Sequence, residues 1–333
     1  MSLAAALALL LGLSVTAYAV FAGADFGAGV LDLLAGARPA ERTAIATTIG
    51  PLWEANHVWL IFTITLLFSV FPTAFAALGT ALLAPLTVTL IALVLRGSAL
   101  GLRSSGDVQS TGGRWLSRLF GVCSVIAPFL FGAIAAGLAE VSSPGSPTAT
   151  ATPSIPWTGV FPLLTGALAV TLCTQLAASL ISIRMTRTGQ ADLAGHFRRR
   201  GLQSAVAALS LSALALAAAS SNAPGLSHRL ASQALALLIL GFAASITSGL
   251  AFRLHRDRLA RGATVLSTVA IIWGWIAAQS PHLIGSLTLH SAAASGAAQT
   301  AVALAVGVTL VTVLPALFLL FGVSARPLPE ETR

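Results

Sequence analysis

Long apolar runs, separated by short polar connections, constrain this sequence more than any other feature. A transmembrane helix needs about 20 mostly apolar residues, because each residue rises about 1.5 Å through a hydrocarbon core about 30 Å thick. The composition agrees with a membrane location, since 56% of the 333 residues are hydrophobic, 8% are charged and the mean hydropathy is +0.90. We therefore expect an all-α, polytopic integral membrane protein with about nine transmembrane helices. The nine apolar runs are residues 3–34, 54–78, 80–102, 116–139, 157–183, 201–220, 231–252, 262–280 and 297–322.

The arginines predict how these runs are oriented. The chain has no lysine, and its net charge of +8 comes from 18 arginines against 10 acids. When Arg96 and Arg118 are counted with the nearest connections, seventeen arginines fall on one side of the membrane and only Arg229 on the other. The positive-inside rule then places the N-terminus outside and the C-terminus in the cytoplasm. Because the arginines are scattered between apolar runs, we expect membrane lipid and no nucleic acid as a partner.

A Pro/Ser/Thr-rich segment divides the chain into two predicted bundles. The first run lacks a preceding basic residue and continues through Asp25 and Asp32, so we expect a retained helix and not a cleaved signal peptide. The predicted organisation is a four-helix membrane bundle with the intramembrane charges (1–140), an outer linker (141–156), a five-helix membrane part (157–323) and a cytoplasmic tail (324–333).

Ionisable residues enter the membrane within one bundle. Asp25 and Asp32 are seven residues apart on the first run, hence on one helical face, and Arg96 lies about two turns inside the third run. Glu54 and His57 lie three apart at the start of the second run, after a Gly-Pro pair that favours a helix start. The expected result is a group of five ionisable side chains in the cytoplasmic half of three helices.

Two roles are expected for this group. Asp32 and Arg96 are shallow enough to form a structural charge network, in which Arg96 pairs with either Asp25 or Asp32. Asp25 and Glu54 are expected on a proton path, because a carboxylate at depth can take up and release protons. For His57, a proton relay, a hydrogen bond to Glu54 and a subunit contact all remain open.

Close helix packing and the absence of haem ligation are also expected. Gly23 and Gly27 form a small-xxx-small face that lets another helix approach. Cys123 and Cys173 form no CxxC motif and are expected to be buried packing residues. A haem usually needs a second axial ligand, and neither Met1 nor Met185 is expected in a bundle core. We therefore expect no metal site and no bound cofactor in this chain alone.

Several motifs carry a resemblance to a known family. They are Tyr18–Gly29, the segment I-G-P-L-W-E-A-N-H-V-W-L-I-F from Ile49, Phe71-Pro72, Leu95–Ala99 and the segment W-G-W-I-A-A-Q-S-P from Trp273. In order and spacing the chain resembles subunit II of the cytochrome bd-type quinol oxidases, close to the cyanide-insensitive branch. Its first helix reads F-A-G-A-D-F-G where the family pattern is near L-D-G-F-D-x-G, so Asp25 is kept while Ala22 replaces an earlier acid.

The resemblance implies the non-haem partner of a haem-bearing subunit I in a multi-pass complex of the bacterial cytoplasmic membrane. That complex oxidises quinol and reduces dioxygen to water, with haems b and d, or b only, in subunit I. It implies a proton entry near Glu54, within a motif that also contains Trp53, Asn56 and Trp59, and a structural quinone is left open. The alternative is a secondary transporter with acids in its first helices.

Overall fold

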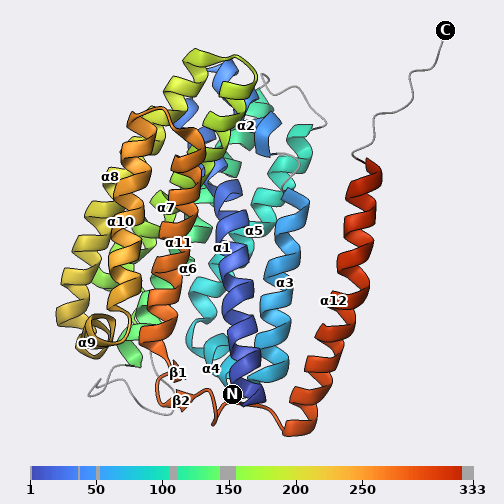
Figure 1. The fold of residues 1–333 in the computed structure, drawn as a ribbon, viewed down its shortest axis with the longest axis vertical. Helices are drawn as coiled ribbons and strands as arrows, with labels where there is room; N and C mark the ends of the chain where they lie inside the picture. The colour runs from blue at the N-terminus through green and yellow to red at the C-terminus, as the bar shows by residue number, and fades with distance from the viewer. Residues whose placement is uncertain (1, 37, 50–52, 105–110, 143–154, 325–333) are drawn as a thin grey trace.

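The protein is a bundle of long helices that run roughly along one axis (Figure 1). In this computed structural model the described residues are 2–36, 38–49, 53–104, 111–142 and 155–324, and side chains are not described at 49, 53–56, 104, 111, 310 and 313–324. The helices are α1 (Leu3–Ala35), α2 (Pro39–Ile49), α3 (Trp53–Val70), α4 (Pro72–Ala81), α5 (Leu83–Ser104), α6 (Thr111–Val141), α7 (Val160–Arg187), α8 (Ala191–Asn222), α9 (Pro224–Ser232), α10 (Leu235–Arg253), α11 (Asp257–Gln279) and α12 (Gly296–Ser324).

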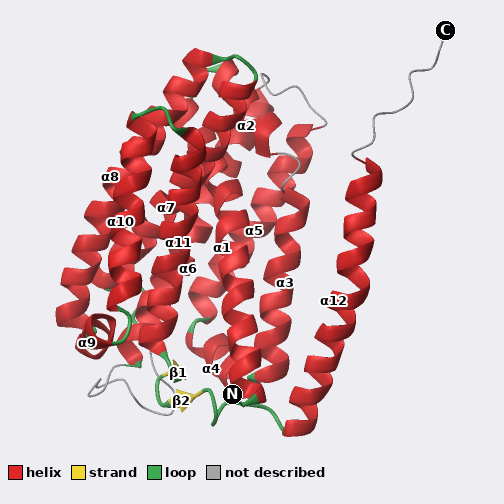
Figure 2. Cartoon of the chain, viewed as in Figure 1, coloured by secondary structure: helices red, strands yellow, loops and turns green. Residues whose placement is uncertain are grey.

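The prediction of an all-α membrane protein is confirmed. Figure 2 shows helix nearly throughout, with one short hairpin of β1 (His282–Ile284) and β2 (Leu287–Thr288). Within the described residues, seven helices are long and apolar enough to cross a membrane, or eight if the bent pair α3–α4 counts as one span. The described apolar part of α12 is shorter, Gly296–Thr309, so the expected total of nine spans stays a prediction.

The second apolar run is not one straight helix, contrary to the predicted span 54–78. It breaks at Phe71, and the axes of His57–Val70 and Pro72–Ala81 differ by 115°. Pro72 lacks an N–H and disfavours the helical conformation at the residue before it, and Phe71 has φ −129° and ψ 59°. The bend places α4 across the end of the bundle, where the Ala294 N–H donates to the Val70 carbonyl at 2.8 Å.

Other boundaries also differ from the prediction. Helix α8 begins ten residues before the predicted 201, because the arginine-rich segment around Arg198–Arg200 continues the helix. Its first turns bury Ala194 and Phe197, so packing adds to the good helix propensity of arginine. Helices α2 and α9 lie in segments that the sequence predicts as connections, since each is too short and too polar to resemble a span.

Helix α1 packs against α3, α6 and α7. Gly27 makes this possible: a Cβ there would lie 1.8 Å from the Cys173 carbonyl oxygen of α7. On the side of α6, a Cβ at Gly29 would lie 2.0 Å from the Ser124 hydroxyl oxygen. Gly23 approaches α7 less closely, with the Leu176 side chain 3.0 Å from the corresponding position. Since α6 and α7 also pack together, α1, α6 and α7 join the two predicted halves of the chain.

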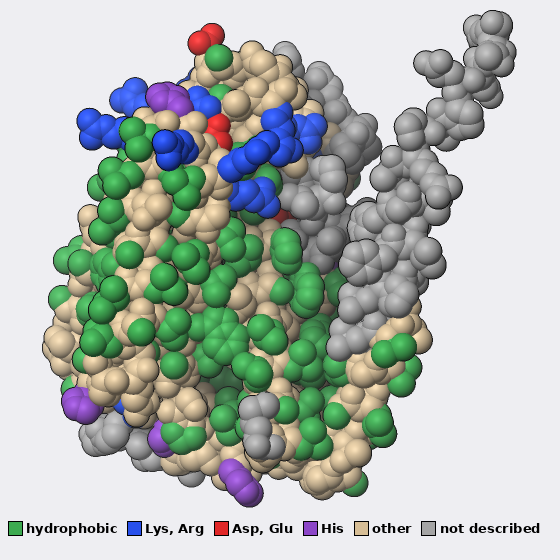
Figure 3. Space-filling model, in the orientation of Figure 1, with side chains coloured by type: hydrophobic (Ala, Val, Ile, Leu, Met, Phe, Trp, Pro, Cys, Tyr) green, Lys and Arg blue, Asp and Glu red, His purple; other side chains and the backbone are tan. Residues whose placement is uncertain are grey.

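The described arginines gather at one end of the bundle. Figure 3 shows their side chains above a broad apolar surface, at the end where α2 lies. Helices α1, α5, α7 and α10 end there, and α6, α8 and α11 begin there. Arg229 of α9 is the exception among the described residues, since α9 lies at the opposite end. We call these the arginine-rich end and the opposite end.

The close contact at Gly27 gives a prediction about stability. Gly27→Ala should destabilise the protein by about 1–3 kcal/mol or more, because α1 and α7 must separate to admit a methyl group against a backbone carbonyl. Thermal unfolding of the detergent-purified protein measures the effect. Gly79→Ala is the matched control, since a Cβ there meets nothing within 4 Å. Equal unfolding temperatures for both variants would contradict this account of the helix contact.

Candidate functional site

A buried ion pair joins the first and third predicted runs. The Arg96 Nη2 of α5 lies 2.7 Å from the Asp25 Oδ1 of α1 and also donates to the Asp25 carbonyl oxygen at 3.1 Å. The Arg96 Nε donates to the Ser124 hydroxyl of α6 at 2.8 Å. Asp25 is 2% exposed and Arg96 3% exposed, so water contributes little to either charge. Of the two acids expected as partners for Arg96, the structure brings Asp25 to it.

Aromatic rings enclose this ion pair. The Arg96 guanidinium carbon lies 4.9 Å from the ring centre of Phe26 and 4.7 Å from that of Phe120. Tyr18 packs edge-on against Phe26, and both cysteines, Cys123 and Cys173, belong to the same buried cluster. Ring faces attract a cation, so this environment favours the guanidinium while it excludes water from the ion pair.

A second acid–arginine pair lies nearer the arginine-rich end. Asp32 is buried, and its Oδ2 accepts from the Arg103 Nη1 at 2.9 Å, while the Arg42 Nε of α2 lies 3.8 Å from Oδ1. Asp25 and Asp32 are seven residues apart on α1, and Arg96 and Arg103 are seven residues apart on α5. Two ion pairs in series therefore join the same two helices, and we call these four residues the ladder. The sequence reasoning assigned Arg103 only to topology, although the shared seven-residue spacing was the signal that could have paired it with Asp32.

The proposed proton entry lies at the start of α3. Helix α3 includes Glu54, but the side chains of Trp53, Glu54 and Asn56 lie outside the described part of the structure, so a contact between Glu54 and His57 is not described. The His57 side chain is exposed, and Trp59 stacks on Phe21 of α1 with ring centres 6.4 Å apart.

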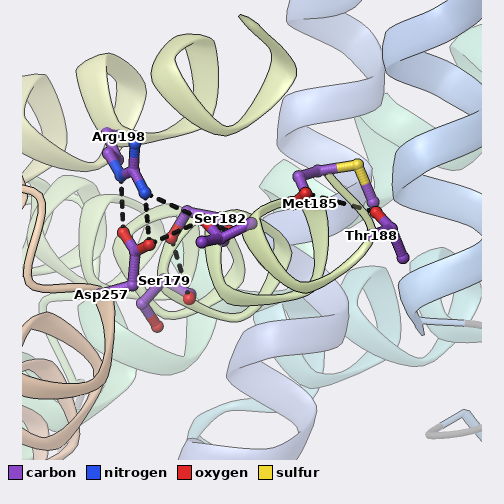
Figure 4. Close-up of polar contacts among 7 residues, drawn as sticks. Ser179, Ser182, Met185, Thr188, Arg198 and Asp257 are labelled. Carbon is purple, nitrogen blue, oxygen red and sulfur yellow. Dashed lines mark hydrogen bonds and ion pairs between the residues drawn. The ribbon is translucent and has the colours of Figure 1, made fainter. Parts of the chain in front are cut away.

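A further ion pair lies at the arginine-rich end, within the second half of the chain (Figure 4). Arg198 of α8 binds Asp257 of α11 through two hydrogen bonds, Nε–Oδ1 at 2.8 Å and Nη2–Oδ2 at 2.6 Å. The Thr186 hydroxyl of α7 donates to the same Oδ2 at 2.8 Å. Three helices therefore share one buried carboxylate. Sequence reasoning missed this cluster, because the arginines here were interpreted only as topology signals.

The described residues contain no group of three or more histidine, cysteine, aspartate or glutamate side chains placed to hold a metal ion. All six histidines have partly or fully exposed side chains. Met185 is buried, contrary to expectation, because the last turns of α7 continue into the core beside Phe197. In that cluster Met185 packs with Phe197 and other buried apolar side chains.

The helices and the buried ion pairs define a polytopic membrane protein with an internal charge network at one side of the membrane. The sequence model of cytochrome bd terminal oxidase subunit II matches residues 3–324, so the chain belongs to this family. It is a multi-pass protein of the bacterial cytoplasmic membrane.

Relatives and a solved structure agree with this family. The chain is 34% identical over 112 residues to cytochrome bd ubiquinol oxidase subunit 2 of Bacillus subtilis, covering 34% of this chain and 33% of the relative. It is 29% identical over 124 residues to cytochrome bd-I ubiquinol oxidase subunit 2 of Escherichia coli strain K12, covering 37% and 32%. These alignments span about a third of the relatives' length.

The fold is similar to a chain of the bd oxidase from Geobacillus thermodenitrificans, with a TM-score of 0.79. That similarity covers 98% of this chain and 99% of the other, at 18% identity. The transporter alternative is not favoured by these comparisons.

The Asp25–Arg96 pair gives a second prediction. Arg96→Ala should lower the amount of assembled protein more than the turnover of what assembles, because it strands a buried carboxylate at a cost of about 3–5 kcal/mol. Adding Asp25→Ala should recover part of the loss, since no buried charge is then left unpaired. Yield and thermal unfolding measure both effects, with the exposed Arg253→Ala as control. Normal yield with lost turnover would instead assign Arg96 to the chemistry.

Proposed function

We propose that this chain is the non-haem subunit of a bd-type oxidase that oxidises quinol and reduces dioxygen to water. The family match across residues 3–324 is the observation that carries this proposal. The haems of a subunit I, b and d or b alone, would supply the electron transfer to dioxygen. This chain would support the assembly of subunit I. Quinol would be oxidised by the assembled complex and not by this chain alone.

The same proposal includes nine spans, with the N-terminus outside and the C-terminus in the cytoplasm. The arginine-rich end supports the orientation, because positively charged connections stay on the cytoplasmic side. The bent pair α3–α4 and helix α12 would complete the seven straight spans. The division into 1–140, 141–156, 157–323 and 324–333 stays a prediction.

We also infer a proton route from the cytoplasm through Glu54, His57 and Asp25. Glu54 lies in the first turn of α3, where the helix dipole favours an anion by about 0.3–1 kcal/mol. The His57 side chain, one turn further along, is exposed in this chain. Asp25 is the deepest described acid of the network, and its ion pair with Arg96 supports a role for a charge at that depth. Asp32 and Arg103 would hold the helices that flank the route.

Replacement of Glu54 tests this route. Glu54→Gln keeps the size and much of the hydrogen bonding but cannot exchange a proton, so quinol-driven oxygen consumption per assembled complex should fall at least about tenfold. Glu54→Asp should keep much of the rate. The measurement is oxygen uptake by the purified complex with a quinol substrate.

Asp192→Asn is the matched control, because Asp192 is an exposed acid in the first turn of another helix, α8, and is not part of the proposed route. Full activity of an assembled Glu54→Gln complex at neutral and alkaline pH would remove Glu54 from the route. Loss of activity in Asp192→Asn as well would point to a general effect of surface charge.

The absence of bound haem in this chain is a further prediction. The isolated chain should show no stoichiometric Soret band, because its histidines are all at least partly exposed and the described residues hold no group of three or more histidine, cysteine, aspartate or glutamate side chains placed to bind a metal ion. The assembled complex should show the haem spectrum. A Soret band of the isolated chain that disappears on His57→Ala would contradict the assignment of all haems to the partner.

A further inference from the structure

A cavity opens at the arginine-rich end, between the last turns of α7 and the first turns of α11. Its volume is about 700 Å³, and Thr48 of α2 also lines it. Four arginines line it, two from each helix: Arg184 and Arg187 of α7, and Arg258 and Arg261 of α11. All four arginines are exposed, and their like charges surround one open cavity, an arrangement that a bound anion would stabilise.

These four arginines have no acidic partner in the described structure. No ion pair among the described residues involves any of them. The nearest acid in the sequence, Asp257, is already bound by Arg198 on two oxygens (Figure 4). Arg187 of α7 and Arg261 of α11 line the same cavity, so their like charges repel each other. The cavity therefore presents charge that the described protein does not neutralise.

The lining changes from charged to apolar over a single helical turn. Each arginine is followed, four residues further into its helix and so about 6 Å deeper, by an apolar or glycine residue that also lines the cavity. On both helices the charged residues lie at the end of the span and the apolar residues lie toward its middle. The four pairs are Arg187 with Ile183, Arg184 with Leu180, Arg261 with Val265 and Arg258 with Gly262.

We propose that this cavity binds the headgroup of an anionic phospholipid. The arginines contact the phosphodiester, since a guanidinium forms two parallel hydrogen bonds to phosphate oxygens. The upper part of the acyl chains runs along Leu180, Ile183 and Val265 toward the apolar surface of the bundle. A lipid of the same leaflet would thereby bridge α7 and α11 at the end where Asp257 already joins them.

The apolar depth of the cavity favours a lipid over a soluble anion. Free phosphate needs only the arginines, and burial of its charge beside Leu180 and Val265 would be unfavourable. A phospholipid matches both parts of the lining in the same order along the membrane normal. Basic pockets between transmembrane helices on the cytoplasmic side are a known physical basis for the recognition of anionic headgroups.

Gly262 offers a variant that fills the cavity without changing its charge. A Cβ at this position meets nothing within 4 Å, so Gly262→Phe should place its ring in open space. The substitution also replaces a glycine inside a helix, so helix propensity does not oppose it. The complementary variant, Arg187→Gln with Arg261→Gln, leaves the space but removes two charges. Arg253→Gln with Arg256→Gln removes two exposed arginines of the neighbouring connection and is the matched control.

Native mass spectrometry of the delipidated, detergent-purified complex tests the proposal. It counts bound lipid during titration with phosphatidylglycerol or with phosphatidylcholine of the same acyl chains. The wild-type complex and the Arg253/Arg256 control should retain one tightly held phosphatidylglycerol that Gly262→Phe lacks. The Arg187/Arg261 variant should bind it roughly 30-fold more weakly, from about 1 kcal/mol per arginine.

Three results would overturn the proposal: equal binding in the wild-type and Gly262→Phe complexes, equal binding of the two lipids, or displacement of the lipid by an equimolar amount of inorganic phosphate. The last result would assign the cavity to a soluble anion. If one variant does not assemble, the other decides, because they act on space and on charge separately. The readout is lipid binding and not oxygen uptake, so its failure would leave the proposed oxidase function untouched.

Discussion

The buried ion pair between Asp25 and Arg96 is the interaction on which the arrangement of the first half depends. Two charges away from water are stable only when they face each other and their remaining hydrogen bonds are satisfied. Arg96 meets that condition through the Asp25 carboxylate and carbonyl, the Ser124 hydroxyl and two aromatic rings. This geometry needs α1 close to α6, which Gly29 allows.

The arginine-rich end contains two kinds of arginine that differ in their partners. Arg103 and Arg198 each bind a buried carboxylate and thereby join helices from different parts of the chain. The cavity between α7 and α11 is lined by arginines without such partners. Arginines at helix ends look alike in the sequence but therefore have different roles: some form internal ion pairs, some only set the topology, and some line the proposed lipid site. Only the position of each acid separates these roles.

The proposals for this chain agree with one physical picture. A subunit without haem can still shape the environment of an oxidase through fixed charges inside the membrane and through the lipids around it. The ladder of Asp25, Asp32, Arg96 and Arg103 includes α1, which packs against α3, the helix that begins with the motif containing Glu54. The proposed lipid site lies on α7 and α11 instead, so proton supply and lipid binding can be tested independently.

The sequence by itself determined the membrane class, most of the spans and the end at which the arginines lie, because hydropathy and charge are local properties that depend on no partner. It also placed Asp25 and Asp32 on one face, since the helical period is fixed. Only the tertiary structure decided that Arg96 binds Asp25 while Arg103 binds Asp32, because that choice depends on the relative height and rotation of helices distant in sequence. The same holds for the cavity at Gly262. The bend at Pro72 was locally encoded, but a hydropathy window averages over it, and packing of α4 across the bundle end decided its angle.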